Sequence, residues 1–200
     1  MALNLCEKIL RDAGADTITT NYRIDHFASK SFAEKHGYIR SFSSTYMEYT
    51  GYQFDIPFLS IREYNDDDYE SAHQMYARAF HEMRIRVGDF PNSVIEQPND
   101  SMRKYWALTK KDRLVYVQGS EIIGYSHIVG NEIGSISIKS QYQGQGIGRM
   151  FMKFIINKIL EDGYKTVSLY CVVGNMAKRL YDSLGFIDMY TVEYAIKSVR

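Results

Sequence analysis

The same pattern of a helix, a strand, a second helix and a second strand occurs twice in this sequence. One copy contains KILRDAGADTIT, which begins at Lys8, and the other contains KILEDGYKTVSL, which begins at Lys158. In both copies a glycine, Gly37 or Gly185, follows the second helix, and an aromatic residue comes directly after it. Internal repeats usually reflect the reuse of one structural unit, so we interpret the copies as a duplication. The alternative is that two ordinary αβ units share generic patterning.

The first copy occupies the beginning of the chain. Its expected elements are a helix over 2–11, a strand over 16–24, a helix over 26–38 and a strand over 41–49. The second copy repeats this order, with a helix over 149–163, a strand over 165–173, a helix over 175–186 and a strand over 190–199. In the second helix of the first copy, the spacing predicts that Phe27, Phe32 and Ala33 face inward.

The segment between the copies has no counterpart in the first copy. Its expected elements are a strand over 58–64, a helix over 65–80, an irregular loop over 88–100, a short helix over 101–110 and three strands over 113–139. Tight turns at Gly119-Ser120 and Gly130-Asn131 join these three strands. From about residue 56 the order is therefore β-α-α-β-β-β-α-β-α-β, which predicts a mixed α/β sheet with helices on its faces.

A glycine-rich stretch, SQYQGQGIGR, separates a strand from the first helix of the second copy. Glycines allow the backbone to approach a ligand closely, and the helix adds its dipole and its unpaired N-terminal amides. This arrangement is typical of a site for an anion, and a pyrophosphate is the natural ligand. A Walker loop would need a Gly-Lys-Ser/Thr ending, which GIGRM lacks. A Rossmann fingerprint would need another glycine spacing and a carboxylate near the end of the next strand.

The stretch SIKSQYQGQGIGRM resembles the acetyl-CoA-binding motif Q/R-x-x-G-x-G/A of the GNAT N-acetyltransferases, with Gln143, Gly146 and Gly148 in its defined positions. The downstream stretch NMAKRLYDSLGF is similar to that family's second signature, an Asn, a small residue, a Tyr and a terminal Gly-Phe. The resemblance covers roughly residues 56–200, including the order of elements. It implies an α/β (α+β mixed sheet) protein with the GNAT acyl-CoA N-acyltransferase fold, preceded by a partial second GNAT-like αβαβ unit.

The resemblance also implies a site for acetyl-CoA (coenzyme A) in a V-shaped opening between two parallel strands that splay apart. The backbone near Ile136 and Ile138 would align the pantetheine arm, and Asn175 would hydrogen-bond it. Backbone amides of the glycine loop would hold the pyrophosphate, and the residues concerned are Gln143, Gly144, Gln145, Gly146, Ile147, Gly148 and Arg149. The side chains of Gln143 and Arg149 would assist, with a solvated first-turn residue as the alternative for Arg149.

The implied reaction is the direct attack of a neutral amine on a thioester in a ternary complex, which needs a base and an acid for the departing thiolate. Tyr181 occupies the position that supplies the acid in many family members, and a core tyrosine is the alternative. Glu132 is favoured as the base over His127, and a turn carboxylate and a sheet histidine are the alternatives. Cys171 is not selected as an acyl carrier, because a strand cysteine is usually a small core residue. Amino acids, polyamines, aminoglycosides and peptide N-termini all remain candidate acceptors.

The first copy lacks both candidate functional side chains. Aligned on the glycine after its second helix, it has Phe27 in place of Asn175 and Ala33 in place of Tyr181. It therefore resembles the back half of a degenerate GNAT domain, as in tandem GNAT proteins in which one domain often retains the cofactor site. We expect a partial, degenerate unit over 1–50, a linker over 51–57 and a complete acetyltransferase domain over 58–200.

The strand expected over 16–24 would lack the neighbour that precedes a glycine loop. We interpret the chain as a truncation, a shortened gene product or one half of a split protein. Exposed strand edges invite pairing, so residues 1–50 are expected to dock on a second copy, or exchange with it, in a homodimer.

The composition of the chain limits which partners and which cellular location are expected. The 24 basic and 24 acidic residues cancel, so no nucleic-acid or membrane partner is expected. Cys6 and Cys171 are too few for a disulfide framework or a thiolate metal site, and no apolar run approaches the roughly 20 residues of a membrane span. A cytoplasmic location is the expectation. The leading function is an acetyl-CoA-dependent N-acetyltransferase, and a non-catalytic acyl-CoA-binding sensor or assembly module is the alternative.

Overall fold

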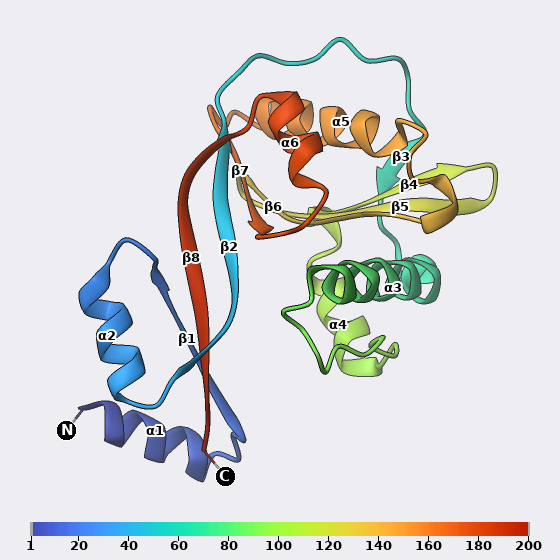
Figure 1. Ribbon diagram of the computed structural model, residues 1–200. Helices are drawn as coiled ribbons and strands as arrows, with labels where there is room; N and C mark the ends of the chain where they lie inside the picture. Colours follow the sequence, from blue (N-terminus) through green and yellow to red (C-terminus); the bar gives the residue numbers. More distant parts are fainter. Residues whose placement is uncertain (1, 200) are drawn as a thin grey trace.

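The computed structural model describes residues 2–199, which form one eight-stranded sheet with helices on both faces (Figure 1). The strands lie in the order β1-β8-β2-β7-β6-β5-β4-β3. Their bounds are β1 (Thr17–Arg23), β2 (Ile39–Tyr49), β3 (Ile61–Glu63), β4 (Arg113–Gln118), β5 (Glu121–Val129), β6 (Glu132–Ile138), β7 (Val167–Val172) and β8 (Ile187–Ser198). Neighbouring strands are antiparallel except β6 and β7, which are parallel. The prediction of a mixed sheet is confirmed.

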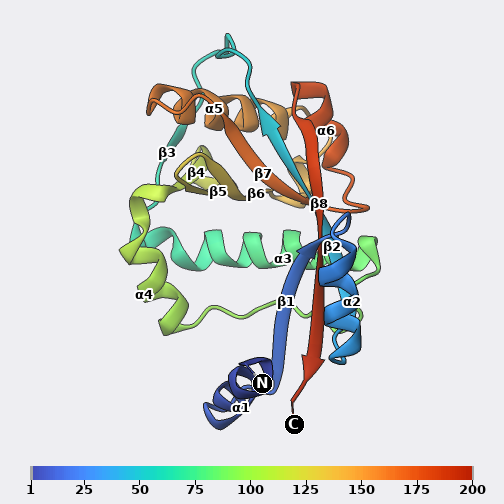
Figure 2. The same ribbon diagram turned by 90° about the vertical axis from the view of Figure 1, so that its left-hand side faces the viewer.

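The helices lie in two layers. They are α1 (Ala2–Asp12), α2 (Phe27–Lys35), α3 (Tyr69–Val87), α4 (Asp100–Leu108), α5 (Ile147–Glu161) and α6 (Lys178–Leu184), with 3-10 turns η1 (Asp66–Asp68), η2 (Lys110–Asp112) and η3 (Ser140–Tyr142). Helices α5 and α6 cover one face of the sheet, and α3 and α4 lie on the opposite face (Figures 1 and 2). Helix α3 continues beyond its expected end at residue 80 and stops at Gly88, whose φ of 85° favours glycine. Within residues 2–199, none of the helices combines the length and hydropathy that a membrane-spanning helix requires.

The larger hydrophobic core lies between α5 and the sheet. The apolar residues of α5 recur every three or four positions, so they lie on one face of the helix. They are Phe151, Met152, Ile155, Ile156 and Ile159, each at most 1% exposed. This face belongs to the same buried cluster as Met47 of β2 and Leu169 and Cys171 of β7. The packing holds the beginning of α5 directly behind the glycine loop.

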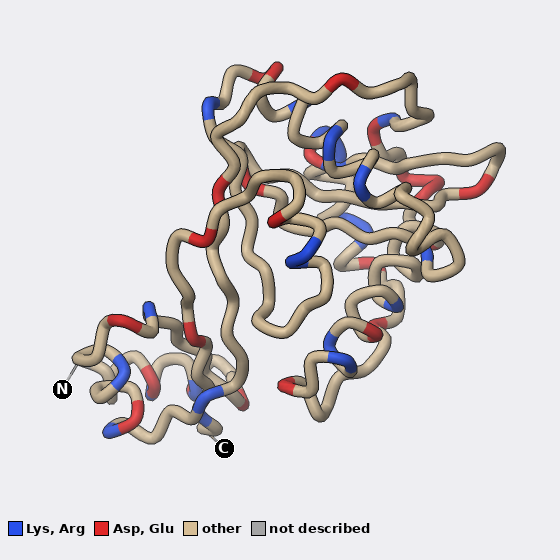
Figure 3. Tube along the Cα trace, turned by 45° about the horizontal axis from the view of Figure 1, so that its top comes forward, with Lys and Arg blue, Asp and Glu red and all other residues tan. Residues whose placement is uncertain are grey.

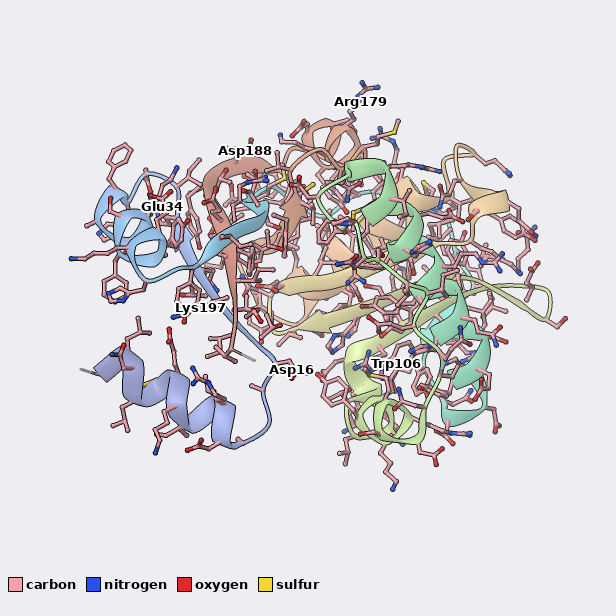
Figure 4. The ribbon with its side chains drawn as sticks, turned by 60° about the horizontal axis from the view of Figure 1, so that its bottom comes forward. Asp16, Glu34, Trp106, Arg179, Asp188 and Lys197 are labelled. Atoms are coloured by element: carbon pink, nitrogen blue, oxygen red, sulfur yellow. The ribbon has the colours of Figure 1, made fainter. Side chains whose placement is uncertain are left out.

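The core on the opposite face is aromatic. Trp106 of α4, labelled in Figure 4, stacks on Tyr125 of β5 with 4.6 Å between ring centroids. Tyr69 of α3 meets Trp106 edge-on at 5.5 Å. The buried guanidinium of Arg113 lies 4.6 Å from the Trp106 ring, a cation–π contact in a water-poor setting. These contacts anchor α3 and α4 against β4 and β5.

The strands of the two sequence copies alternate at one end of the sheet. Strand β2 of the first copy lies between β8 and β7, and β8 of the second copy lies between β1 and β2. Tyr46 of β2, for example, pairs with both Tyr170 of β7 and Tyr190 of β8. An ion pair of 2.8 Å between Glu7 and Lys197 ties α1 to β8 (Figure 4 labels Lys197). Residues 17–49 therefore complete the same sheet as the rest of the chain. Strand β1 is an edge, because no other described strand pairs with its second side.

The second helix of the first copy differs from the expectation. Phe27 and Phe32 are 76% and 52% exposed, and only Ala33 of the three residues predicted to face inward is buried. Helix α2 packs on a small cluster that includes Tyr22 and Tyr38, and no described element covers its other side. The expectation was confirmed for Ala33 and wrong for Phe27 and Phe32, because apolar spacing identifies a helix face but does not show whether another element covers that face.

Candidate active site

Strands β6 and β7 pair at only two positions and then separate. Glu132 pairs with Ser168 and Ile133 pairs with Leu169, and the described residues form no further pair between the two strands. The β5–β6 register shifts at Gly134, which lies opposite no residue of β5. An extra residue of this kind bends a strand. The bulge therefore accounts for the opening between the carboxyl halves of β6 and β7.

The carboxyl half of β6 directs backbone groups into this opening. The amide of Lys139 donates to the carbonyl of Ile123 on β5, over 2.9 Å. Neighbouring residues of a strand direct their backbone groups to opposite sides, so Ile136 and Ile138 direct theirs away from β5. The carbonyl of Ile138 accepts a bond of 2.9 Å from Nε2 of Gln143. Both positions are thus oriented to bond an extended ligand lying along β6.

The glycine loop leaves a row of backbone donors without protein acceptors. Within residues 2–199, the amides of residues 144–149 donate no hydrogen bond to the protein. Gly144 and Gly146 have φ values of 75° and 83°, which residues with a side chain adopt only with strain. Gly146 is also the N-cap of α5 and has no side chain to occupy the first amides of that helix. The dipole of α5 adds to these donors, so the loop is suited to an anion.

A cavity of about 460 Å³ lies between β6, β7, the second half of α3 and the beginning of α6. The predicted site residues that line it are Ile136, Ile138, Gln143, Gly144, Gly148, Asn175 and Tyr181. The predicted site residues outside its walls are Glu132, Gln145, Gly146, Ile147 and Arg149. Nη2 of Arg149 donates to Oγ of Ser183 on α6 over 2.8 Å, so the guanidinium is directed to α6. Nε2 of Gln145 likewise donates back to the carbonyl of Gln141 over 2.8 Å.

The beginning of α6 places two predicted side chains at the cavity. Oδ1 of Asn175 accepts from the amide of Ala177 over 3.0 Å, which leaves the Asn175 side-chain NH₂ group available to a ligand. Tyr181 is 8% exposed, and within residues 2–199 its hydroxyl has no hydrogen-bond partner. Burial raises the pKa of Tyr181 well above the usual range, and the neighbouring Cys171 adds to the effect. The phenol therefore stays protonated and can donate a hydrogen bond into the cavity.

The two candidate bases lie near the amino end of the opening. Glu132 is half-buried and has no ion-pair partner among the described residues, and burial raises its pKa. Burial, and then the charge of Arg113, lower the pKa of His127 to about 4, so this imidazole is neutral at pH 7. Neither residue lines the cavity itself. Glu132 adjoins it through Tyr170, a wall residue whose pKa the Glu132 charge helps to raise.

The structure adds wall residues that the sequence did not indicate. The second half of α3 closes the open end of the V, with Oε2 of Glu82 3.0 Å from Oγ of Ser140 and a Val87 methyl group beside Gly174. Ser137 of β6 also lines the cavity, and its buried hydroxyl has no hydrogen-bond partner. Glu82 and Val87 reach the cavity because α3 runs along this side of the opening. No sequence motif marked these wall residues in advance.

Other kinds of site are not evident in the described part of the chain. Within residues 2–199, no group of three or more His, Cys, Asp or Glu side chains is arranged to hold a metal ion. Lys and Arg alternate with Asp and Glu along the trace (Figure 3). The uncapped amides and the splayed strands are thus the features that point to a ligand.

The fold is that of known acetyltransferases. A GCN5-related N-acetyltransferase from Sphaerobacter thermophilus superimposes with a TM-score of 0.64 at 18% identity, covering 99% of this chain and 67% of that one. A GCN5-related N-acetyltransferase from Kribbella flavida gives a TM-score of 0.61 at 13% identity, covering 98% and 74%. A tandem GNAT protein from the clavulanic acid biosynthesis pathway gives 0.61 at 14% identity, covering 98% and 68%. The chain thus spans about two thirds to three quarters of the length of these structures.

The comparison of the sequence with known protein families gives the same result as the comparison of the fold. The family described as "Acetyltransferase (GNAT) domain" matches residues 69–197, which is more than half of the chain. A search of curated proteins finds no match. The chain belongs to the GNAT acetyltransferase family. Members of this family generally bind acetyl-CoA and act on amine acceptors.

Proposed function

We propose that this protein transfers an acetyl group from acetyl-CoA to a primary amine of a small molecule or peptide by direct attack in a ternary complex. The observation that carries the proposal is the opening between β6 and β7, which leads from the uncapped amides of residues 144–149 to the phenol of Tyr181. The amides suit a diphosphate, the strand edge suits an extended amide-containing arm, and the phenol suits a leaving sulfur. The residues present therefore fit the family's cofactor.

In this proposal the cofactor is held mainly by the backbone. The amides of the glycine loop bind the diphosphate, with the α5 dipole behind them. The backbone groups of Ile136 and Ile138 and the side-chain NH₂ group of Asn175 bind the pantetheine arm. The side chain of Gln143 supports the loop through its bond to the Ile138 carbonyl. Bound acetyl-CoA would supply an acyl group activated as a thioester.

Two side chains handle the protons. Glu132 accepts, through water, the proton that the acceptor amine loses as its nitrogen bonds to the acyl carbon. Tyr181 donates to the sulfur as the carbon–sulfur bond breaks, and exchange with solvent returns both groups to their starting state. The raised pKa keeps Tyr181 protonated until negative charge develops on the sulfur. Its hydrogen bond is therefore strongest in the transition state, where it accelerates the reaction.

We also propose that residues 1–50 are a partial GNAT-like unit joined by residues 51–57 to the domain over 58–200. Two observations support this reading: the repeated element order and the alternation of the strands of the two copies. The open edge of β1 and the exposed Phe27 and Phe32 favour a homodimer through this unit. Light scattering during size exclusion would test it, and a monomer at all accessible concentrations would contradict it.

Calorimetry and a thiol-release assay test the main proposal. The wild-type protein should bind coenzyme A and release thiol from acetyl-CoA in the presence of an amine from a mixed panel. Gly146→Ala should weaken binding, and Tyr181→Phe should slow release while binding persists. Binding without release from any amine would instead support an acyl-CoA sensor. Absence of coenzyme A binding would overturn the proposal.

A further inference from the structure

The chain that follows α3 is docked on a strand of the first copy. Nη2 of Arg40, on β2, lies 2.8 Å from Oδ2 of Asp89, the second residue after α3. The rings of Phe42 and Phe90 lie next to this pair, with 4.9 Å between their centroids. Figure 2 shows α3 running along the sheet toward β2 and β8. We call Arg40, Phe42, Asp89 and Phe90 the docking cluster.

The first-copy side of the docking cluster is built into the sheet. Phe42 stacks on Tyr194 of β8, with 4.4 Å between ring centroids and an angle of 9° between the rings. Nε of Arg40 lies 3.5 Å from Glu193 of β8, and Glu193 accepts a bond of 2.6 Å from the hydroxyl of Tyr22 on β1. The β2–β8 register shifts between Arg40 and Phe42, and a bulge of this kind changes the direction of side chains. The cluster therefore rests on β1, β2 and β8 together.

The other side of the docking cluster is fixed to α3 itself. The guanidinium of Arg84, in the last turn of α3, lies 5.8 Å from the centroid of the Phe90 ring. Nδ1 of His81, one turn earlier, is 3.1 Å from Oγ of Ser93. The loop thus folds back on the last turns of α3. The position of Phe90 is therefore coupled to that of the helix end.

The last turns of α3 form one wall of the cavity. Val87 contacts the glycine position that follows β7, and it lies only two residues before Asp89. The docking cluster therefore fixes this wall at the end that faces β7. We call the α3 residues that line the cavity the α3 wall, and they are Ala79, Phe80, Glu82, Met83, Arg86 and Val87.

The α3 wall faces the part of the cavity that the proposed cofactor contacts leave free. Those contacts come from β6, the glycine loop and α6, and α3 supplies none of them. Ser137 of β6 lies on the α3 side, because it pairs with Tyr125 of the aromatic core under α3. Within residues 2–199 its buried hydroxyl has no hydrogen-bond partner, although Ser137 lines the cavity. Buried polar groups are normally satisfied, so this hydroxyl indicates a polar ligand group on the α3 side.

We propose that Arg40 and Phe42 of the first copy are positioning residues for the acceptor amine, because they hold the end of α3, and with it the α3 wall, against the opening. Neither residue lines the cavity, so both act through Asp89 and Phe90. Release of the α3 end would widen the acceptor side of the cavity. It would leave the glycine loop and Tyr181 in place, since α5 and α6 cover the opposite face of the sheet. The inference rests on the proposed function and gives the first copy a part in the reaction.

Steady-state kinetics test the inference, with the amine of a mixed panel that the wild-type protein acetylates best. Arg40→Gln should raise KM for the amine about 2- to 5-fold and Phe42→Leu about 2- to 10-fold, because a partly exposed ion pair contributes less than a ring pair. Phe42→Tyr keeps the ring and should retain the wild-type KM. The kcat value and the calorimetric affinity for coenzyme A should change less than about 2-fold, because the groups that react and the loop amides do not move.

A double-mutant cycle separates docking from a general loss of stability. Arg40 and Asp89 act through one contact, so Arg40→Gln combined with Asp89→Asn should raise KM no further than the larger single change. Two controls should keep the wild-type KM. Arg103→Gln breaks another partly exposed Arg–Asp pair, of 2.6 Å, and Phe58→Leu changes a ring that is 95% exposed. Additive effects of the two docking changes, or an equal rise of KM in Arg103→Gln, would contradict the assignment.

Hydrogen exchange reads the docking without turnover. In the double variant Arg40→Gln/Phe42→Leu, the amides of residues 82–91 should exchange about 3- to 10-fold faster, while those of α5 should exchange as in the wild type. A wild-type KM in this variant, or a raised KM with wild-type exchange over 82–91, would overturn the inference and leave the proposed function. Absence of thiol release from every amine in the wild-type protein would instead defeat the proposed function and the inference that rests on it.

Discussion

The two copies of the αβαβ unit share one sheet, yet they differ in what covers them. In the second copy, Phe151 and Ile155 of α5 are both 0% exposed. In the first copy, Leu5 and Ile9 of α1 are 59% and 57% exposed. Among the described residues, the cavity lined by predicted site residues lies beside the second copy, where β6, the glycine loop and α3 adjoin the unit.

The aligned positions of the two copies also carry side chains of different chemistry. Asn175 and Tyr181 line the cavity, whereas the aligned Phe27 is exposed to solvent and Ala33 is buried against a small cluster. The order of elements in the first copy persists without either predicted functional side chain. Packing and the proposed function are thus expected to be separable in this fold, and substitutions in matched positions can test that separation.

The largest expected difference concerns stability. Phe151→Ala should lower the free energy of unfolding by about 3–5 kcal/mol, because it leaves a cavity in the α5 core. The matched change Ile9→Ala in α1 should cost less than about 1 kcal/mol, because that side chain is largely in solvent. Urea denaturation measures both. Similar losses would mean that the first copy is covered by something beyond the described contacts.

The next effect is catalytic. Tyr181→Phe should lower kcat about 100-fold, because it removes the donor to the leaving sulfur, with little change in KM. Tyr38→Phe, which removes a buried hydroxyl bonded to Glu7 in the first copy, should leave kcat unchanged. Steady-state thiol release measures both variants. An unaltered kcat in Tyr181→Phe would remove this residue from the mechanism.

A smaller effect is expected in the glycine loop. Gly146→Ala should cost about 1–2 kcal/mol of stability through backbone strain and weaken coenzyme A binding about 10-fold. Gly14→Ala, at a φ of 90° after α1, imposes the same kind of strain in the first copy and should leave binding intact. Calorimetric titration compares them. Equal binding losses would show that strain alone, rather than the position of the loop amides, controls affinity.

The smallest effect concerns pH. Burial raises the pKa of Glu132, and the base acts in its charged form, so kcat/KM should rise with pH and level off above that pKa. Between pH 6 and pH 8 we expect less than about a 10-fold change, absent in Glu132→Gln. The pH dependence of stability has the opposite sign. Burial favours the neutral form of Glu132 in the folded state, so the contribution of Glu132 to the free energy of unfolding falls as pH rises. A pH–rate profile that Glu132→Gln leaves unaltered would assign the base elsewhere.

The sequence alone predicted the repeated order of elements, the mixed sheet and the glycine loop. These features are local: helix periodicity, β-branched strands and glycine spacing act over a few residues, so they can be read without knowing the fold. The resemblance carried by Gln143, Gly146, Gly148 and the Asn–Tyr signature then indicated the family, which the match over residues 69–197 supports.

The interleaving of the strands of the two copies, and the residues that lie beside the opening, became visible in the three-dimensional structure. Strand order depends on pairing between residues far apart in the chain, so no local pattern placed β2 between β7 and β8. The same holds for Glu48, which lies in the first copy but reaches the row of Glu132 through Ser168. It also holds for Arg149, whose guanidinium binds Ser183 rather than facing the cavity. Side-chain neighbours across a sheet are set by register, and register is a property of the assembled sheet.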